Sequence, residues 1–177
     1  MKITIKSILT IALVMGLGFM ANAQKTSSAP ASATVLADLT IALDGTQSEI
    51  AFGTLSANSP GAVVLDANGT ANANTGSATK VAKFDLGGAS SAVTVNYDAT
   101  VTLSNTDPTP ATMTMTPEVV GAALATDQTT ATAVPIGSQV TLVSGAFYLW
   151  VGGSIPQLAS QATGVYSGTF NIDVEYN

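Results

Sequence analysis

The residues that most often carry catalysis are scarce in this chain. It contains no histidine and no cysteine, so the commonest general base, the thiol nucleophile and the usual zinc ligands are missing. Paired carboxylates can still hydrolyse a glycosidic bond, and Asp173 and Glu175 are two residues apart. Their shared face is the polar face of a predicted strand, which indicates solvated surface. A serine and lysine mechanism would need Lys80 or Lys83 beside a serine, which no spacing requires. The sequence therefore predicts that the protein is not an enzyme and needs no cofactor.

Two loop motifs are similar to ligand sites without completing them. Asp66-Ala67-Asn68-Gly69 matches the opening of a calcium loop, but Asp and Glu are missing from the later ligand positions. We therefore predict a plain turn and no metal site. Gly87-Gly88 and Gly152-Gly153 lack the rest of a phosphate loop, and they predict tight turns with positive φ.

Tyr148 and Trp150 are the candidate ligand-binding aromatics. The other large apolar residues of segment 146–151 have odd numbers, so a strand here places Tyr148 and Trp150 together on the opposite face. Two outward aromatics can stack on a sugar, which predicts a glycan-binding surface. In the alternative interpretation both rings cover a second layer of core, because large aromatics are usually mostly buried.

The elements that position such residues are β-strands, and the clearest one ends the chain. Its apolar residues alternate strictly with polar ones, so one face can cover a core while the other meets water. The apolar set is Phe170, Ile172, Val174 and Tyr176.

A second alternation begins the body of the chain, where Val35, Leu39, Ile41 and Leu43 share one parity. One interpretation makes residues 35–43 the first strand of the protein's own sandwich. The other makes them a donor strand that inserts into the next subunit by backbone pairing at an open sheet edge.

Between these two alternations, short runs rich in Val, Thr and Ile are separated by Gly, Asn, Asp and Pro. Such spacing predicts an all-β fold, an antiparallel β-sandwich, in a single domain over residues 34–177. The segment 121–135 is rich in Ala and Thr and is predicted to be a long loop. The predicted strands are 35–43, 48–52, 62–66, 81–86, 92–97, 100–104, 112–116, 139–143, 146–151 and 165–176.

The start of the chain predicts export. Lys2 and Lys6 precede an apolar stretch from Ile8 to Phe19, and Ala21-Asn22-Ala23 has the small-x-small pattern that signal peptidase cuts. The apolar stretch is shorter than the roughly 20 residues of a spanning helix. Residues 1–23 are therefore predicted to be a signal peptide, and residues 24–33 a flexible arm. The expected location is the periplasm, the cell surface or the medium.

Composition limits the partners. Without Lys2 and Lys6 the chain has three basic side chains against eleven acidic ones, a net charge of −8. Nucleic acid is not an expected partner, because phosphate binding needs clustered Lys and Arg. No later apolar run is long enough for a transmembrane helix.

Several motifs occur in an order that resembles a known family. They are Phe52-Gly53, Gly61 followed by Val63-Val64-Leu65-Asp66, Lys83-Phe84, Gly87-Gly88, Thr112-Met113-Thr114, Leu149 to Gly153, and Gly164-x-Tyr166-x-Gly168-x-Phe170 ending at Val174-x-Tyr176. Together they resemble a family of small secreted bacterial domains of unknown function, similar to spore-coat-U-like proteins and alternative chaperone-usher pilins. A glycine fourteenth from the end and a penultimate tyrosine are the most specific part.

This resemblance implies an immunoglobulin-like β-sandwich with no known catalysis. It also implies a structural role as a secreted, pilin-like subunit of a cell-surface fibre or coat, assembled by β-strand complementation. The expected partners are further copies or other surface subunits, with a periplasmic chaperone and an usher. The disulfide that many pilins have is missing here. The alternative function is a self-complemented surface module that binds glycan through Tyr148 and Trp150.

Overall fold

The computed structural model describes residues 25–106 and 108–177, which fall into two units. Residues 25–34 belong to the first unit, are exposed and have no regular secondary structure. The second unit is Val35–Asn177. The predicted signal peptide, residues 1–23, lies outside the described residues.

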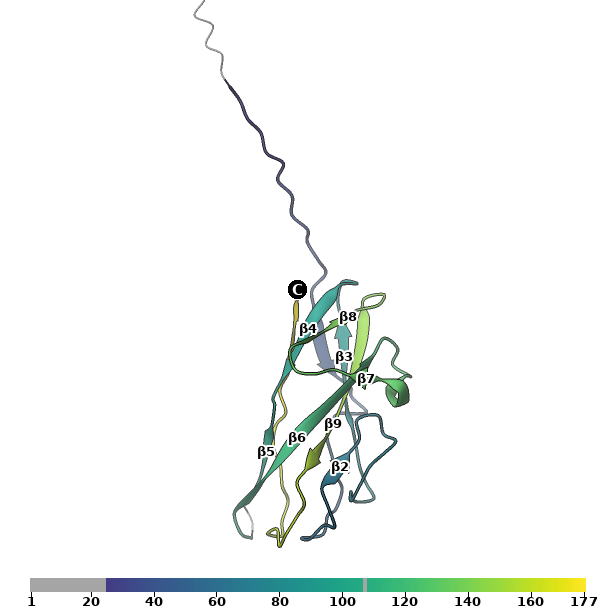
Figure 1. Cartoon of the computed structure of the whole chain (residues 1–177), viewed down its shortest axis with the longest axis vertical. Coiled ribbons are helices and arrows are strands. Elements are labelled where there is room, and N and C mark those ends of the chain that lie inside the picture. The colour runs from purple at the N-terminus through teal and green to yellow at the C-terminus, as the bar shows by residue number, and fades with distance from the viewer. Residues whose placement is uncertain (1–24, 107) are drawn as a thin grey trace, which may run out of the picture. The chain divides into compact units, whose positions relative to one another are not determined.

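The second unit is built from antiparallel strands in two sheets (Figure 1). The seven-stranded sheet has the order β1-β3-β9-β6-β5, with β2 paired to β9 and β7 paired to β6, and the three-stranded sheet has the order β10-β4-β8. This confirms the predicted all-β sandwich. The strands are β1 Thr40–Leu43, β2 Val63–Leu65, β3 Ala82–Gly87, β4 Ala92–Tyr97, β5 Val101–Asn105, β6 Ala111–Ala122, β7 Thr132–Ala133, β8 Ser138–Thr141, β9 Ala146–Ile155 and β10 Ile172–Tyr176, and a short 3-10 helix, η1, covers Gln128–Thr130.

Burial follows the alternation along the strands. In β4, Val93 and Val95 are fully buried while Thr94 between them is half-buried. Strand β9 is different, because Leu149, Trp150 and Val151 are consecutive and all at most 1% exposed. A strand covered on both faces reads as a continuous apolar run, and β9 is the central strand of the large sheet.

Several predicted boundaries change for long-range reasons. The expected strand 48–52 forms only an isolated bridge, Ala51 to Lys80, and the expected strand 165–176 is regular only in β10, with single bridges at Gly164 and Ser167. The turn predicted at Gly152-Gly153 is wrong, since both residues lie inside β9. A Cβ on Gly152 would lie 2.2 Å from the Leu65 carbonyl oxygen, so glycine is needed there for close backbone approach.

Gly87-Gly88 does end a strand, as predicted, but neither residue is among the glycines with positive φ. The segment 121–135 contains the end of β6, η1 and β7 in addition to loop. Among residues 25–106 and 108–177, none of the helical structure has the length and apolar character needed to cross a membrane.

The core has two main parts that are covered unequally. One part, the covered cluster, lies between the two sheets and includes Val93, Val95 and Leu142 from the small-sheet side and Leu149 and Val151 from β9. The other part, the groove cluster, is Phe52, Val63, Leu65, Val101, Met115, Ile155 and Leu158. None of its residues comes from β4, β8 or β10. Figure 1 places β4 and β8 towards one end of the domain and β2 and β5 towards the other. The small sheet therefore leaves one end of the large sheet without a second β-layer.

Candidate functional site

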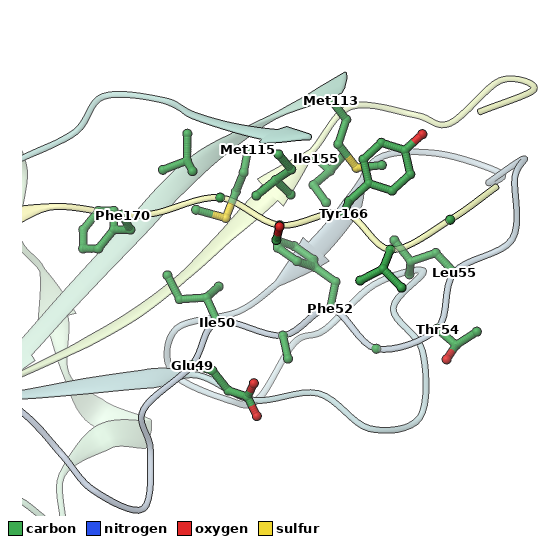
Figure 2. Close-up of a pocket in the computed structure, with 18 of the residues that line it drawn as sticks. Glu49, Ile50, Phe52, Thr54, Leu55, Met113, Met115, Ile155, Tyr166 and Phe170 are labelled. Carbon is green, nitrogen blue, oxygen red and sulfur yellow. The ribbon is translucent and has the colours of Figure 1, made fainter. Parts of the chain in front are cut away.

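An apolar groove lies where this second layer is missing. Its volume is about 950 Å³, its walls are residues 48–57 and 161–170, and the inner face of the large sheet forms its floor (Figure 2). The floor residues are Val101, Leu103, Met113, Met115, Ile155 and Leu158. Because Leu103, Met113, Ile50 and Leu55 are only partly buried, this part of the core still has apolar surface to cover.

The two walls pair with other segments of the chain and, among the described residues, no strand pairing joins them to each other. At one end of the groove Gln161 N–H donates to Ala57 O at 3.0 Å and links the two walls. On one wall Ala51 N–H donates to Lys80 O at 2.8 Å, and Ala51 O accepts from Lys80 N–H at 2.9 Å. On the other wall Ser104 N–H donates to Ser167 O at 2.8 Å, and Ser167 N–H donates to Ser104 O at 3.1 Å. Backbone groups alternate in direction along an extended chain. From this alternation we expect the N–H and C=O groups of the neighbours Ile50 and Gly168 to lie on the side away from Lys80 and Ser104, toward the groove.

A glycine sets the position of the second wall. A Cβ on Gly168 would lie 2.4 Å from the Thr102 carbonyl oxygen, which is closer than van der Waals contact allows. It would also lie 3.0 Å from the Leu103 side chain and 3.1 Å from the Val101 side chain, both tight contacts. Glycine thus lets the wall lie flat against β5, which keeps the groove wide.

The electrostatic character of the groove is nearly neutral. Among the described lining residues the charged one is Glu49, which pairs with Lys80 and points away from the open space in Figure 2. A charged ligand would lose its hydration without gaining a partner there. The groove therefore suits an uncharged, apolar occupant that also offers backbone hydrogen bonds.

The alternating C-terminal residues lie along one edge of the site. Phe170 lines the groove, with its ring centroid 6.2 Å from Phe84 and 5.9 Å from Tyr97. Ile172, Val174 and Tyr176 follow in β10 and are half-buried against the covered cluster. Strand β10 pairs with β4 on one side only, so its other edge is open.

The penultimate tyrosine has a role that the alternation did not predict. The Tyr176 hydroxyl donates to Ala37 O at 2.8 Å and accepts from Ala89 N–H at 2.6 Å. It thereby ties the beginning of the folded unit to its last strand and to the segment that follows β3. We call the end of the domain where residues 37, 89 and 176 meet the arm pole.

The other predicted assembly residues divide between arm and core. Val35 is 93% exposed, whereas Leu39 and Ile41 are partly buried against the covered cluster. Leu43 is 48% exposed and lines the groove. Residues 40–43 form β1, paired with β3 in register Thr40 to Gly87 through Leu43 to Phe84, as expected for the first strand of the protein's own sandwich. Only the part before β1 is left as a candidate donor.

An ion network anchors β1 in place. Lys83 is 8% exposed, and its Nζ lies 3.1 Å from Asp44 Oδ2, 2.9 Å from Asp85 Oδ1 and 5.0 Å from the Tyr148 ring centroid. Burial lowers the pKa of Lys83, but hydrogen bonds and charges of both carboxylates outweigh it and raise that pKa. Bonds from Thr46, with those from Lys83 and Gln47, hold the pKa of Asp44 far below its usual range.

The expected glycan-binding aromatics are not both at the surface. Trp150 is 1% exposed and packs in a third cluster with Ala67 and Val120, while Tyr148 is half-buried beside it. This corrects the interpretation in which both rings face outward, because segment 65–67 crosses the outer face of β9 and covers it. For Trp150 the alternative interpretation is correct, because its ring covers a second layer of core.

Asp66 to Gly69 forms the predicted turn, with Gly69 N–H donating to Asp66 O at 2.9 Å. The Asp66 carboxylate accepts N–H bonds from Asn68, Thr70 and Ala71 at 2.8–3.3 Å, and the Thr70 hydroxyl at 2.9 Å. Burial raises the pKa of Asp66, but these four donors outweigh it and the pKa lies below its usual value. Among the described residues, no group of three or more acidic side chains is placed to hold a metal ion.

Sequence reasoning missed the walls of the groove. Ile50 and Leu55 carry no motif, and the local signals on the walls were the motif Phe52-Gly53, the motif from Gly164 to Phe170 and the expected strands 48–52 and 165–176. Met113 was noted as part of a motif, not as a floor residue. The groove depends on which strands fail to pair, which no local pattern reports.

These observations define a class: an all-β sandwich domain with an open apolar groove between two walls that, among the described residues, form no strand pairing with each other. The chain belongs to the family described as a domain of unknown function, DUF4402, whose model matches residues 39–176. No curated protein matches the chain.

Proposed function

We propose that this protein is an exported structural subunit of a cell-surface fibre or coat that assembles by β-strand complementation. In this mechanism a strand of another copy enters the groove, forms backbone hydrogen bonds with the walls and buries its apolar side chains on the floor. A periplasmic chaperone and an usher are the partners expected to keep the groove covered until assembly.

The groove is the observation that carries this proposal. Its volume of about 950 Å³ is at the upper limit for small-molecule pockets. Two walls whose backbone groups at Ile50 and Gly168 are expected to face inward suit an extended chain better than a compact ligand, because a strand can bond to both edges at once. Each wall spans ten residues, enough for a strand of about five or six.

The arm before β1 is the segment that fits. Residues 25–34 are exposed, and alanine recurs at every second position in 29–33, followed in the same parity by Val35. Alternate small apolar side chains can fill a narrow groove while the other face carries Pro30, Ser32 and Thr34. Apart from Lys25 the segment is uncharged up to Asp38, which matches the neutral lining.

The position of the arm pole favours exchange between copies. Ala37 is held there by Tyr176, while the groove lies along residues 48–57 beyond β1. Within the second unit, Ile41 of β1 and Val174 of β10 already pack in one cluster. Donation to a second copy gives a head-to-tail contact that extends into a fibre.

The experiment compares the chain from residue 24 with a deletion of residues 24–36, which keeps Ala37 as the partner of Tyr176. We expect the longer form to give oligomers that resist heat and detergent on gels and the shorter form to be a monomer in size-exclusion chromatography. Circular dichroism must show the same β-spectrum for both. Oligomers of equal size and stability from the shorter form would contradict the proposal.

A matched pair of substitutions tests the groove itself. Leu55 is a partly buried groove residue, whereas Leu124 is 60% exposed outside the groove. Leu55→Glu places a charge where the occupant must pack and is expected to abolish the oligomers, because an unpaired charge is costly to bury. Leu124→Glu is expected to leave them intact. Equal assembly of both variants would exclude the groove as the site.

A further inference from the structure

All the sulfur of the described chain is gathered in the groove. The sequence has five methionines, of which Met1, Met15 and Met20 lie in the predicted signal peptide. The other two, Met113 and Met115, both line the groove floor, and the chain has no cysteine. Thioethers are the side chains most open to peroxide once thiols are absent.

The two methionines are neighbours with different access to solvent. They are two residues apart on β6 and pair across the sheet with Leu103 and Val101. Met115 is 2% exposed, while Met113 is partly exposed. Figure 2 shows both side chains reaching from β6 into the groove, Met113 beside Tyr166 and Met115 nearer Phe170. An empty groove therefore leaves Met113 open to small solutes and Met115 largely shielded.

We propose that Met113 is an oxidation site that controls whether the groove can take a strand; this inference rests on the proposed function. The oxidant is hydrogen peroxide or another two-electron peroxide. The O–O bond breaks, one oxygen bonds to the Met113 sulfur, the sulfur is oxidised by two electrons and the peroxide is reduced to water. The product is methionine sulfoxide, which is polar and chiral.

The polar side chains beside Met113 are already engaged in hydrogen bonds. The polar groups closest along that wall bond to each other: the Tyr166 hydroxyl donates to Ala162 O at 2.8 Å, and Gln161 Nε2 donates to Tyr166 at 2.7 Å. A strand bound over oxidised Met113 would bury an unsatisfied acceptor. We expect assembly to weaken about tenfold or more.

Occupancy and oxidation then exclude each other. A bound strand covers Met113, so assembled subunits are protected. A subunit that stays empty in an oxidising compartment loses its capacity to join. Oxidation would thus act on the unassembled pool alone.

The test uses the chain from residue 24, separated by size exclusion into monomer and oligomer and treated with hydrogen peroxide. Peptide mass spectrometry follows the gain of one oxygen at each methionine. In the monomer we expect Met113 to oxidise about tenfold faster than Met115, and in the oligomer we expect Met113 to be protected to the same degree. Equal rates at both methionines of the monomer would overturn the site.

Assembly is then measured for treated and untreated monomer. Treated protein is expected to assemble about tenfold more slowly, whereas in Met113→Leu peroxide should change the rate less than twofold relative to the same variant untreated. Oxidised protein that assembles at the untreated rate overturns the inference and leaves strand complementation standing. If no oligomer forms at all, strand complementation fails, and the monomer rates still decide whether Met113 is a selective oxidation site.

Discussion

Replacing Gly168 by alanine tests how the groove wall is held. The new Cβ would lie 2.4 Å from the Thr102 carbonyl oxygen, where ordinary contact begins near 3.4 Å. The atom in the way belongs to the backbone, so the wall itself must move by most of an ångström, away from β5. That shift stretches the two Ser104 to Ser167 hydrogen bonds, now 2.8 and 3.1 Å, beyond bonding range.

The expected cost is about 2 kcal/mol, from two backbone hydrogen bonds at about 1 kcal/mol each. For a domain of this size the melting temperature should fall by roughly 4–8 °C. Gly45→Ala is the matched control, because nothing lies within 4 Å of its Cβ and its φ is not positive. That variant should be neutral or slightly stabilised.

The assay is urea unfolding followed by circular dichroism, with the melting temperature from calorimetry. Gly168→Ala should also assemble more weakly, since its wall moves into the groove. If the two alanine variants have the same free energy of unfolding, the tight contact between residue 168 and β5 does not exist and the account of the wall fails.

Three further predictions concern other parts of the fold. Asp66 has a folded pKa below its usual value, so its contribution to stability is present at neutral pH and is lost as pH falls below about 4 toward the folded pKa. The substitution Asp66→Asn should cost about 2 kcal/mol at pH 7 and should flatten the dependence of the urea midpoint on acid pH. An unchanged pH dependence would contradict this. The substitution Tyr176→Phe removes the hydroxyl that bonds to Ala37 and Ala89 and should lower stability by about 1–2 kcal/mol. The amide of Ala89 should then exchange hydrogen faster. If that amide exchanges at the same rate in the variant and in the unchanged protein, the bond does not hold the arm pole. Trp150 is the only tryptophan, and its fluorescence should be blue-shifted and not quenched by oligosaccharides. Quenching by sugar would favour the glycan-binding alternative. The substitution Trp150→Ala should lower stability by about 3–5 kcal/mol.

Local alternation predicted the strands whose faces differ. Residues 92–97 were predicted with the bounds of β4, and Ile172, Val174 and Tyr176 were placed on one face, because a strand with one covered side imposes a period of two. The same rule failed at Trp150. It assumes a solvated face, and β9 is covered on both.

The groove could not be predicted from local pattern. Residues 48–52 have the composition of a strand, yet their only ladder contact is at Ala51. Gly152 shows the same limit: a Gly-Gly pair signals a turn, and only the tertiary structure shows that the backbone of Leu65 crosses there. Whether a strand lacks a neighbour, or is crossed by another segment, depends on residues far apart in the sequence, which a local pattern does not report.

The central claim is that a strand from another copy fills the space between the two walls. Amide hydrogen exchange, measured residue by residue in monomer and oligomer, tests it most directly. The amides of Ile50 and Gly168 are expected to face the groove and should become strongly protected on assembly. Those of Ala51 and Ser167, already bonded at 2.8 and 3.1 Å, should change little. Oligomers in which Ile50 and Gly168 exchange as fast as in the monomer would contradict the account.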